Sequence, residues 1–421
     1  MRRFTLLAVA IVSACPAPPP EPPGDEGEGE GEGEPVPDST EELPFATWPC
    51  DRLDAFPHAL TSTVTPLLLH FRRADERAEA ERLLGYLEEG WRLEIDELGL
   101  AEPLPDTTDD GGYGCGEDER LDVFLWAGHE ESFVDVVAER AATATEDYAT
   151  MMVVDPYGPY GGDVLRCTAL HELHHMSQAA LDWWDAAVVY EMSATFVEDT
   201  VAGCHDSWEF ALEEIQESPE LPIDLDDGYA GWFMYGQALY LVFLQQGVFD
   251  GDSAFLAQMW QGMPSPAGED PDYQDALDAL LAPHGMSFLD TVPRYARWRW
   301  YTGARDDGAH FARGALYPEV EVGSVDATGP TSIVVRPALL GTSYLAVSGE
   351  GSVTLDVEGV PAGARVVVQA LPGDAADGDV LTLPAAVTLP RTLAVTALPD
   401  GPTDVDARST APLALTVRLT R

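Results

Sequence analysis

The chain has 421 residues, and 74 acidic side chains against 22 basic ones give it a formal net charge of −52 at pH 7. This charge argues against nucleic acid and anionic membrane surfaces as partners, because both repel a strongly acidic protein. The length is sufficient for a sizeable core and predicts two or three domains.

The N-terminus has the pattern of a bacterial lipoprotein signal peptide, residues 1–14. Met1-Arg2-Arg3 is a short basic start, and Phe4–Val12 is an apolar run too short to span a bilayer. Val12-Ser13-Ala14-Cys15 matches a lipobox, so we expect cleavage before Cys15 and a lipid anchor on its thiol. The alternative is cleavage without lipidation. The protein is then expected as an exported lipoprotein of the cell envelope or cell surface.

Residues 15–44 are rich in Pro, Gly and Glu and contain the run GEGEGEGEGE. Such a composition buries little apolar area and predicts a disordered, extended tether. Farther along, Asp106–Glu119 combines clustered carboxylates with glycine turns, which suits Ca²⁺. The alternative is an ordinary solvated loop, because the spacing of an EF-hand is absent.

Residues 45–319 are predicted to form a mostly helical α+β domain. Leu67–Leu98 has helical periodicity, whereas Leu121–Trp126 and Thr150–Asp155 read as short buried strands. Further helices are predicted at Phe210–Glu217, Tyr235–Gln246, Ala254–Trp260, Tyr273–Leu281 and Phe288–Trp300.

The segment His171-Glu172-Leu173-His174-His175 is an H-E-x-x-H motif on a helix-forming background. His171 and His175 are one helical turn apart, so both imidazoles project from one face and can bind one zinc ion. Glu172 can then act as general base on a water at the open zinc position. An amphipathic helix that merely carries histidines is the alternative. His174 could face solvent or substrate, or serve a structural role.

A third ligand is expected from Tyr190–Thr200, YEMSATFVEDT. Glu191 is the candidate ligand, and Glu198 lies on the same helical face, where it could hold the N–H of a metal-bound imidazole. His205 is an alternative ligand outside this helix. The metzincin pattern would require Gly at position 178 and His at position 181, but the chain has Gln178 and Leu181.

HELHH followed by E-x-x-A-x-x-x-E resembles the gluzincin zinc metallopeptidases, nearer the aminopeptidase-N branch than thermolysin. The resemblance covers roughly residues 60–305, and only the zinc motif is strongly specific. Met192 replaces the glycine that follows the third ligand in that branch, and the spacing from His175 to Glu191 is shorter. No G-x-M-E-N exopeptidase loop is visible, so aminopeptidase activity does not carry over. The pattern as a whole is closest to uncharacterised metallopeptidase-like lipoproteins of bacteria.

The resemblance implies two further features. Tyr229–Gln246 is similar to the segment that supplies a tyrosine to stabilise the oxyanion, with Tyr235 as the candidate and Tyr229 in reserve. Ordinary packing of both rings is the alternative. Thr150–Asp155 precedes the zinc motif, where zincins place the edge strand that pairs with an extended substrate. A purely structural strand is equally compatible with the sequence.

From residue 320 to 421, short β-rich segments alternate with Gly, Pro and Asp turns. They predict an antiparallel β-sandwich with an accessory role. The segments are Ser332–Val335, Ser343–Val347, Val353–Val357, Arg365–Leu371, Leu381–Leu383, Arg391–Ala397 and Leu413–Leu419.

Four cysteines remain besides Cys15, and an even number in an exported protein favours two disulfides. Three pairings are possible. If the two metal-bearing helices run antiparallel, a Cys167–Cys204 bond would brace them and leave Cys50–Cys115 as the second bond.

The sequence thus predicts a zinc-dependent peptidase on a zincin-like α+β scaffold, acting on a peptide or protein substrate. One alternative is a surface binding protein with a catalytically degenerate zincin domain. Another is a zinc amidase acting on cell-wall material. Cleavage specificity and oligomeric state are not predicted.

Overall fold

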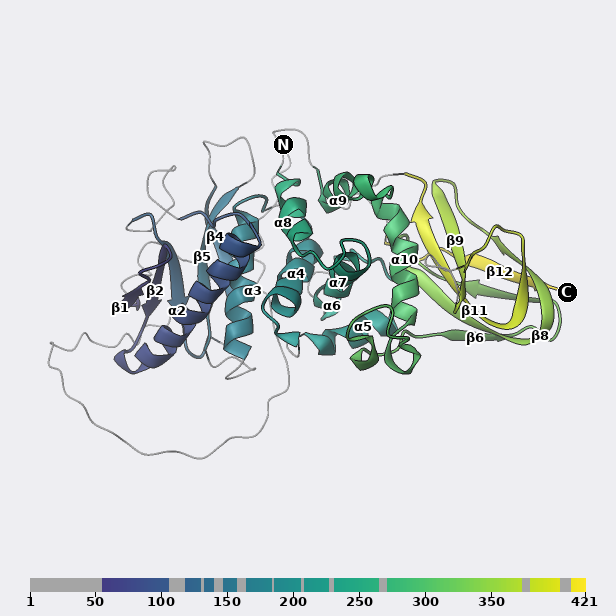
Figure 1. The fold of residues 1–421 in the computed structure, drawn as a ribbon, viewed down its shortest axis with the longest axis horizontal. Helices are drawn as coiled ribbons and strands as arrows, with labels where there is room; N and C mark the ends of the chain where they lie inside the picture. The colour runs from purple at the N-terminus through teal and green to yellow at the C-terminus, as the bar shows by residue number, and fades with distance from the viewer. Residues whose placement is uncertain are drawn as a thin grey trace, which may run out of the picture. The chain divides into compact units, whose positions relative to one another are not determined.

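The computed structural model describes residues 55–105, 118–129, 132–139, 147–156, 164–183, 185–205, 208–226, 231–264, 271–372, 379–401 and 410–421. The described residues form helices and two sheets, of which one is largely antiparallel, and this is compatible with the predicted α+β class (Figure 1). The chain forms two compact units, Met1–Trp183 with Pro264–Ala267, and Trp184–Met263 with Gly268–Arg421. The signal peptide, Cys15, the tether, Cys50, Cys115 and most of the acidic loop lie outside the described residues.

The first unit contains a five-stranded mixed sheet in the order β1-β2-β3-β5-β4. Its three inner strands are parallel, and the two edge strands, β1 and β4, run antiparallel to their neighbours. The strands are β1 (His58–Thr61), β2 (Leu67–Phe71), β3 (Leu121–Leu125), β4 (Phe133–Glu139) and β5 (Tyr148–Val154).

Two sequence-based predictions for this sheet are wrong. The run Leu67–Phe71 is the buried strand β2 and not the start of a helix, because a continuous apolar run fits both structures. The segment Thr150–Asp155 does contain strand β5, but β5 is an inner strand between β3 and β4. The edge next to it is formed by β4, which the sequence reading did not identify.

Two helices complete the described part of the first unit. Helix α2 (Arg77–Trp91) follows the short turn η1 (Ala74–Glu76) and continues into the π-helical segment η2 (Arg92–Glu97). It packs against β2 and against α3 (Val164–Ala179), which in turn packs against β5 and β4. The α2–α3 contact includes an ion pair in which the Arg166 guanidinium donates to both carboxylate oxygens of Glu89, at 2.8 and 3.0 Å.

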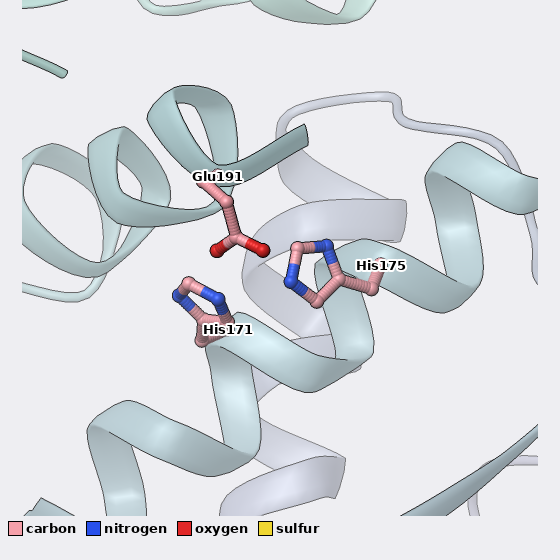
Figure 2. A group of neighbouring side chains, drawn as sticks. All are labelled: His171, His175 and Glu191. Carbon is pink, nitrogen blue, oxygen red and sulfur yellow. The ribbon is translucent and has the colours of Figure 1, made fainter. Parts of the chain in front are cut away.

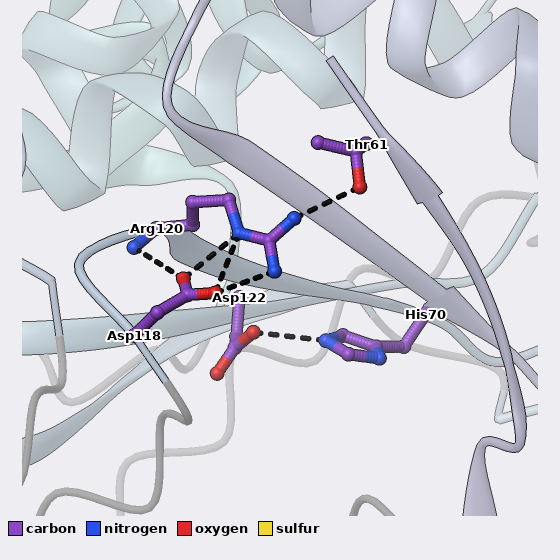
Figure 3. Close-up of polar contacts among 5 residues, drawn as sticks. All are labelled: Thr61, His70, Asp118, Arg120 and Asp122. Carbon is purple, nitrogen blue, oxygen red and sulfur yellow. Dashed lines mark hydrogen bonds and ion pairs between the residues drawn. The ribbon is translucent and has the colours of Figure 1, made fainter.

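A buried polar pair joins β2 and β3, two of the three inner strands of this sheet (Figure 3). His70 Nε2 lies 2.8 Å from Asp122 Oδ1, and the His70 ring stacks on Phe124, its register partner. Beside the pair, Arg120 binds the Asp118 carboxylate and donates to Thr61 Oγ1 on β1. Because these contacts connect three strands, they help to fix the strand register.

The second unit begins with a group of helices. The predicted helices are confirmed, with Tyr273–Leu281 and Phe288–Trp300 at the predicted bounds, and with Tyr235–Gln246 divided between α6 and α7. The elements are α4 (Ala187–Phe196), η4 (Val197–Val201), η6 (Glu209–Ala211), α5 (Leu212–Glu217), α6 (Phe233–Gly236), α7 (Ala238–Gly247), α8 (Ala254–Gln261), α9 (Tyr273–Leu281), η7 (Ala282–His284), α10 (Phe288–Trp300), η8 (Gly303–Arg305) and η9 (Gly314–Leu316). None of the helices that the structure describes is long and apolar enough to cross a membrane.

A seven-stranded sheet completes the second unit. Its order is β10-β9-β11-β8-β12-β7, with β6 paired to β8, and every pairing except β6–β8 is antiparallel. Helix α10 packs against β9 and β11. The strands are β6 (Gly323–Asp326), β7 (Thr331–Val335), β8 (Thr342–Glu358), β9 (Ala364–Leu371), β10 (Asp379–Val380), β11 (Ala385–Pro399) and β12 (Leu415–Thr420).

The β-rich region differs in detail from its sequence prediction. The predicted strands Ser343–Val347 and Val353–Val357 belong to one continuous strand, β8, which passes through Gly349 and Gly351 at positive φ. Glycine accepts this backbone conformation, so the strand bends there without ending. The predicted strand Leu381–Leu383 is not a strand, because the pairing with β9 ends at Val380.

Candidate metal centre

Helix α3 carries both histidines of the H-E-x-x-H motif. His171 and His175 are 6% and 3% exposed, and their ring centroids are 4.6 Å apart. This proximity follows from the helical spacing, because residues four apart lie above one another on one face. The predicted helical placement of these two side chains is therefore confirmed.

Glu191 completes a group of three potential metal ligands (Figure 2). It projects from α4 and is fully buried. One ligand atom from each of His171, His175 and Glu191 lies within 4.8 Å of the other two, so the group could bind a metal ion. No other group of three such residues occurs in the parts of the chain that the structure describes.

The position of Glu191 on its own unit is fixed by the packing of α4. Helix α4 packs against α6 and α7, and Trp260 of α8 donates from Nε1 to Ser193 Oγ at 3.2 Å. The Trp260 ring also meets Tyr190 edge to face, with centroids 5.2 Å apart. Because Tyr190 and Ser193 flank Glu191 on the helix, these contacts restrain the main chain that carries the carboxylate.

Gln178 supports one imidazole, a role that the sequence analysis did not assign. Its Oε1 lies 2.7 Å from His175 Nδ1, which can donate its proton to the amide oxygen. That tautomer leaves Nε2 of His175 to bind a metal, and such a partner commonly orients metal-binding histidines. The i, i+3 spacing on α3 could have suggested this contact.

Glu172 lies beside His171 on α3 and is 4% exposed. Its catalytic role remains a prediction. His174, whose role the sequence left open, is wholly buried, which excludes the solvent-facing position. Its Nδ1 lies 3.3 Å from Oε2 of Glu94, a buried residue of η2 that the sequence analysis did not select.

Burial has opposite effects on the members of this pair. It raises the pKa of the Glu94 carboxyl well above its usual value, an effect that His171 partly offsets. It lowers the pKa of the His174 imidazole well below its usual value, and the neighbouring His175 and His171 lower it further. Both environments disfavour the charged form of the side chain in the absence of a compensating charge.

The remaining predicted residues lie on the second unit. Glu198 lies in the π-helical segment η4 and is 9% exposed, and its main-chain carbonyl accepts from the Cys204 N–H. Tyr235 is half-buried on α6, which packs against α4, and its ring lies next to Trp232. Their proposed roles remain predictions. Tyr229 lies outside the described residues.

The alternative ligand His205 is not part of the group. Its Nδ1 lies 2.7 Å from Asp199 Oδ1, and its side chain is 41% exposed. A half-exposed histidine bound to a neighbouring carboxylate fits a surface contact better than a buried metal site.

The predicted Cys167–Cys204 disulfide is present. Cys167 lies one turn before His171 on α3, and Cys204 follows the helical segment that contains Glu191 and Glu198. The bond therefore joins the two chain segments that supply the metal ligands. It also excludes these two cysteines from metal coordination.

Comparison with known proteins adds no family assignment. No protein-family model matches the chain, and no curated protein does.

Proposed function

We propose that this protein is a zinc-dependent peptidase on a zincin-like scaffold. The observation that carries the proposal is the convergence of two buried imidazoles and one buried carboxylate, from His171, His175 and Glu191, with Glu172 adjacent on the same helix. The similarity of HELHH and of the Glu191 segment to gluzincin peptidases supports the same conclusion.

The donor set fits a catalytic zinc ion. Zinc prefers nitrogen and oxygen donors in a tetrahedron, and its structural sites are usually closed by four protein ligands, mostly cysteines. Here the group has three members among the described residues, which leaves one position for water or substrate. The hydrogen-bond partner of His175, Gln178, is of the kind that zinc sites use to orient an imidazole.

Each protein group then has a distinct task. When bound by His171, His175 and Glu191, zinc would supply Lewis acidity to polarise the scissile carbonyl and to make water more acidic. Glu172 accepts the proton of the attacking water and passes it to the leaving amine. Tyr235 donates a hydrogen bond to the developing oxyanion.

A feature of the first unit favours an extended peptide as substrate. Strand β4 is an antiparallel edge strand of the described sheet and packs against α3, the helix that carries both histidines. An edge strand offers unpaired main-chain groups that can bind an extended chain as an additional strand. This role, which the sequence suggested for β5, is proposed here for β4.

The same proposal accounts for the rest of the chain. Acylation of Cys15 would anchor the protein to the cell envelope, and a disulfide is typical of an oxidising compartment. The β-rich region would be a sandwich with an accessory role, because the chemistry-bearing residues lie elsewhere.

The test is metal content followed by activity. We expect about one zinc per chain in the wild type, with marked loss in Glu191→Ala, because two ligands hold zinc far more weakly than three. Asp224→Ala is the matched control, since it removes another buried carboxylate of the second unit. Asp224 binds Tyr273 and Gln274, so its loss should lower stability and leave the zinc content unchanged.

The outcomes separate the alternatives. Zinc binding with hydrolysis of a denatured protein supports the peptidase. Zinc binding with hydrolysis of cell-wall fragments alone would indicate an amidase. A folded wild type without zinc would favour the degenerate binding protein and contradict the proposal.

A further inference from the structure

Glu94 and His174 form an isolated polar pair inside the first unit. Both side chains are 0% exposed, and His174 Nδ1 lies 3.3 Å from Glu94 Oε2. Neither side chain makes a well-aligned hydrogen bond with any group that the structure describes. The pair therefore depends on its mutual electrostatic contact within apolar surroundings.

The pair lies beside a tight contact between α2 and α3. Gly90, one turn before Glu94, permits this approach, because a Cβ there would lie 2.9 Å from Leu173 Cδ2 and 3.2 Å from Leu170 Cγ. The same Cβ would lie 3.5 Å from Glu94 Oε1, so the carboxylate is next to the contact. Glu94 also belongs to a π-helical segment, and such irregular turns occur frequently at functional sites.

Stability alone does not explain why these two polar side chains are buried together. Replacing a buried charged or polar pair by apolar residues of similar volume is often neutral or stabilising, so a helix contact does not need one. The pair has a specific location, because His174 immediately precedes His175 on α3 and follows His171 by three residues. A contact that holds the His174 side chain therefore also restrains the turn of α3 that carries the two imidazoles.

We propose that Glu94 is a positioning residue of the metal centre, which acts through His174 to orient α3. The proposal rests on the metal site of the proposed function. It assigns a role in metal binding to η2, a segment that carries none of the three ligands.

The test compares Glu94→Gln with the wild type in the full-length protein. Zinc affinity is measured by competition with a chromophoric chelator, and the visible absorption of the Co²⁺-loaded protein reports the ligand geometry. We expect the zinc affinity to fall about 10- to 100-fold and the cobalt bands to change in position or intensity. Glu94→Asp, which keeps a carboxyl group on a shorter side chain, should recover part of the affinity.

Glu76→Gln is the matched control. Glu76 is also a buried carboxylate of the first unit, but it accepts main-chain N–H groups of Arg72 and Arg73 at the start of the α2 region. Its replacement should lower thermal stability without changing zinc affinity or the cobalt spectrum. A purely structural role of Glu94 would give the same result as this control.

Each outcome is informative. If the wild type binds zinc and Glu94→Gln has the same affinity and spectrum, the positioning role is wrong and the proposed function stands. If the wild type binds no zinc, the proposed function fails first. If Glu94→Gln does not fold by circular dichroism, His174→Gln receives the same measurements, and unchanged zinc affinity there overturns the proposal.

Discussion

Glu172 is the residue whose replacement separates metal binding from chemistry. It neighbours His171 on α3 but is not one of the three converging ligands. We expect Glu172→Gln to keep its zinc and to lose peptidase activity about 10²- to 10⁴-fold, because the amide cannot accept the proton of water. Zinc analysis and hydrolysis of a denatured protein check this, and undiminished activity would exclude Glu172 as the base.

Tyr235 permits a second test on a single atom. Its half-buried ring lies on α6, which packs against the helix of Glu191. If its hydroxyl stabilises the oxyanion, Tyr235→Phe should lower kcat about 100-fold with little change in KM. Tyr273→Phe is the control, because it removes a hydroxyl bound to Asp224 and should affect stability alone. Equal kinetics of the two variants would remove Tyr235 from the mechanism.

Among the elements, α2 contains two glycines with opposite expected effects. A Cβ at Gly85 meets nothing within 4 Å, so Gly85→Ala should stabilise the protein by about 0.5–1 kcal/mol through the helix propensity of alanine. A Cβ at Gly90 would crowd Leu173 and Leu170 of α3, so Gly90→Ala should destabilise it by about 1–3 kcal/mol. Urea unfolding of both variants measures the two changes in the free energy of unfolding. Equal changes of the same sign would contradict the prediction.

The predictability of the elements depended on how local their signals are. Helices α9 and α10 were predicted to the residue, because a side-chain cap and amphipathic spacing mark them, with Asp272 capping α9 and Ser287 capping α10. Strand β2 was mistaken for helix, since its five buried residues carry no alternation. The bend of β8 at Gly349 and Gly351 depends on pairing with β11, which no local pattern reveals.

The residues of the site also differ in whether a local sequence pattern predicts them. His171, Glu172 and His175 were accessible from spacing on one helix, and Glu191 from the second motif with its resemblance to known peptidases. Glu94 was not accessible, because its contact with His174 spans two elements far apart in the sequence and depends on how α2 packs against α3. The contact between Gln178 and His175 could have been predicted from their i, i+3 spacing on one helix. It was missed because an amide side chain is not a usual zinc ligand.

For the whole molecule, the disulfide is expected to contribute to stability. Removing a native disulfide of this kind typically costs about 2–4 kcal/mol, chiefly by releasing the unfolded chain from a closed loop. We therefore expect the double variant Cys167→Ser/Cys204→Ser to unfold at lower urea concentration than the oxidised wild type. Reduced wild type should unfold like the reduced variant, and a difference between the oxidised and the reduced variant would report another disulfide. No difference between variant and oxidised wild type would contradict the expectation.

The same bond limits how far the molecule can be stretched. Under a force applied at the two ends, tension passes from Cys167 to Cys204 through the sulfur atoms, so the main chain between them bears no load. That segment would add about 130 Å to the fully extended length, at roughly 3.6 Å per residue. The fully extended length of the oxidised protein is therefore shorter than that of the reduced chain. The segment that carries Glu191 lies within the closed loop and is not extended by the force.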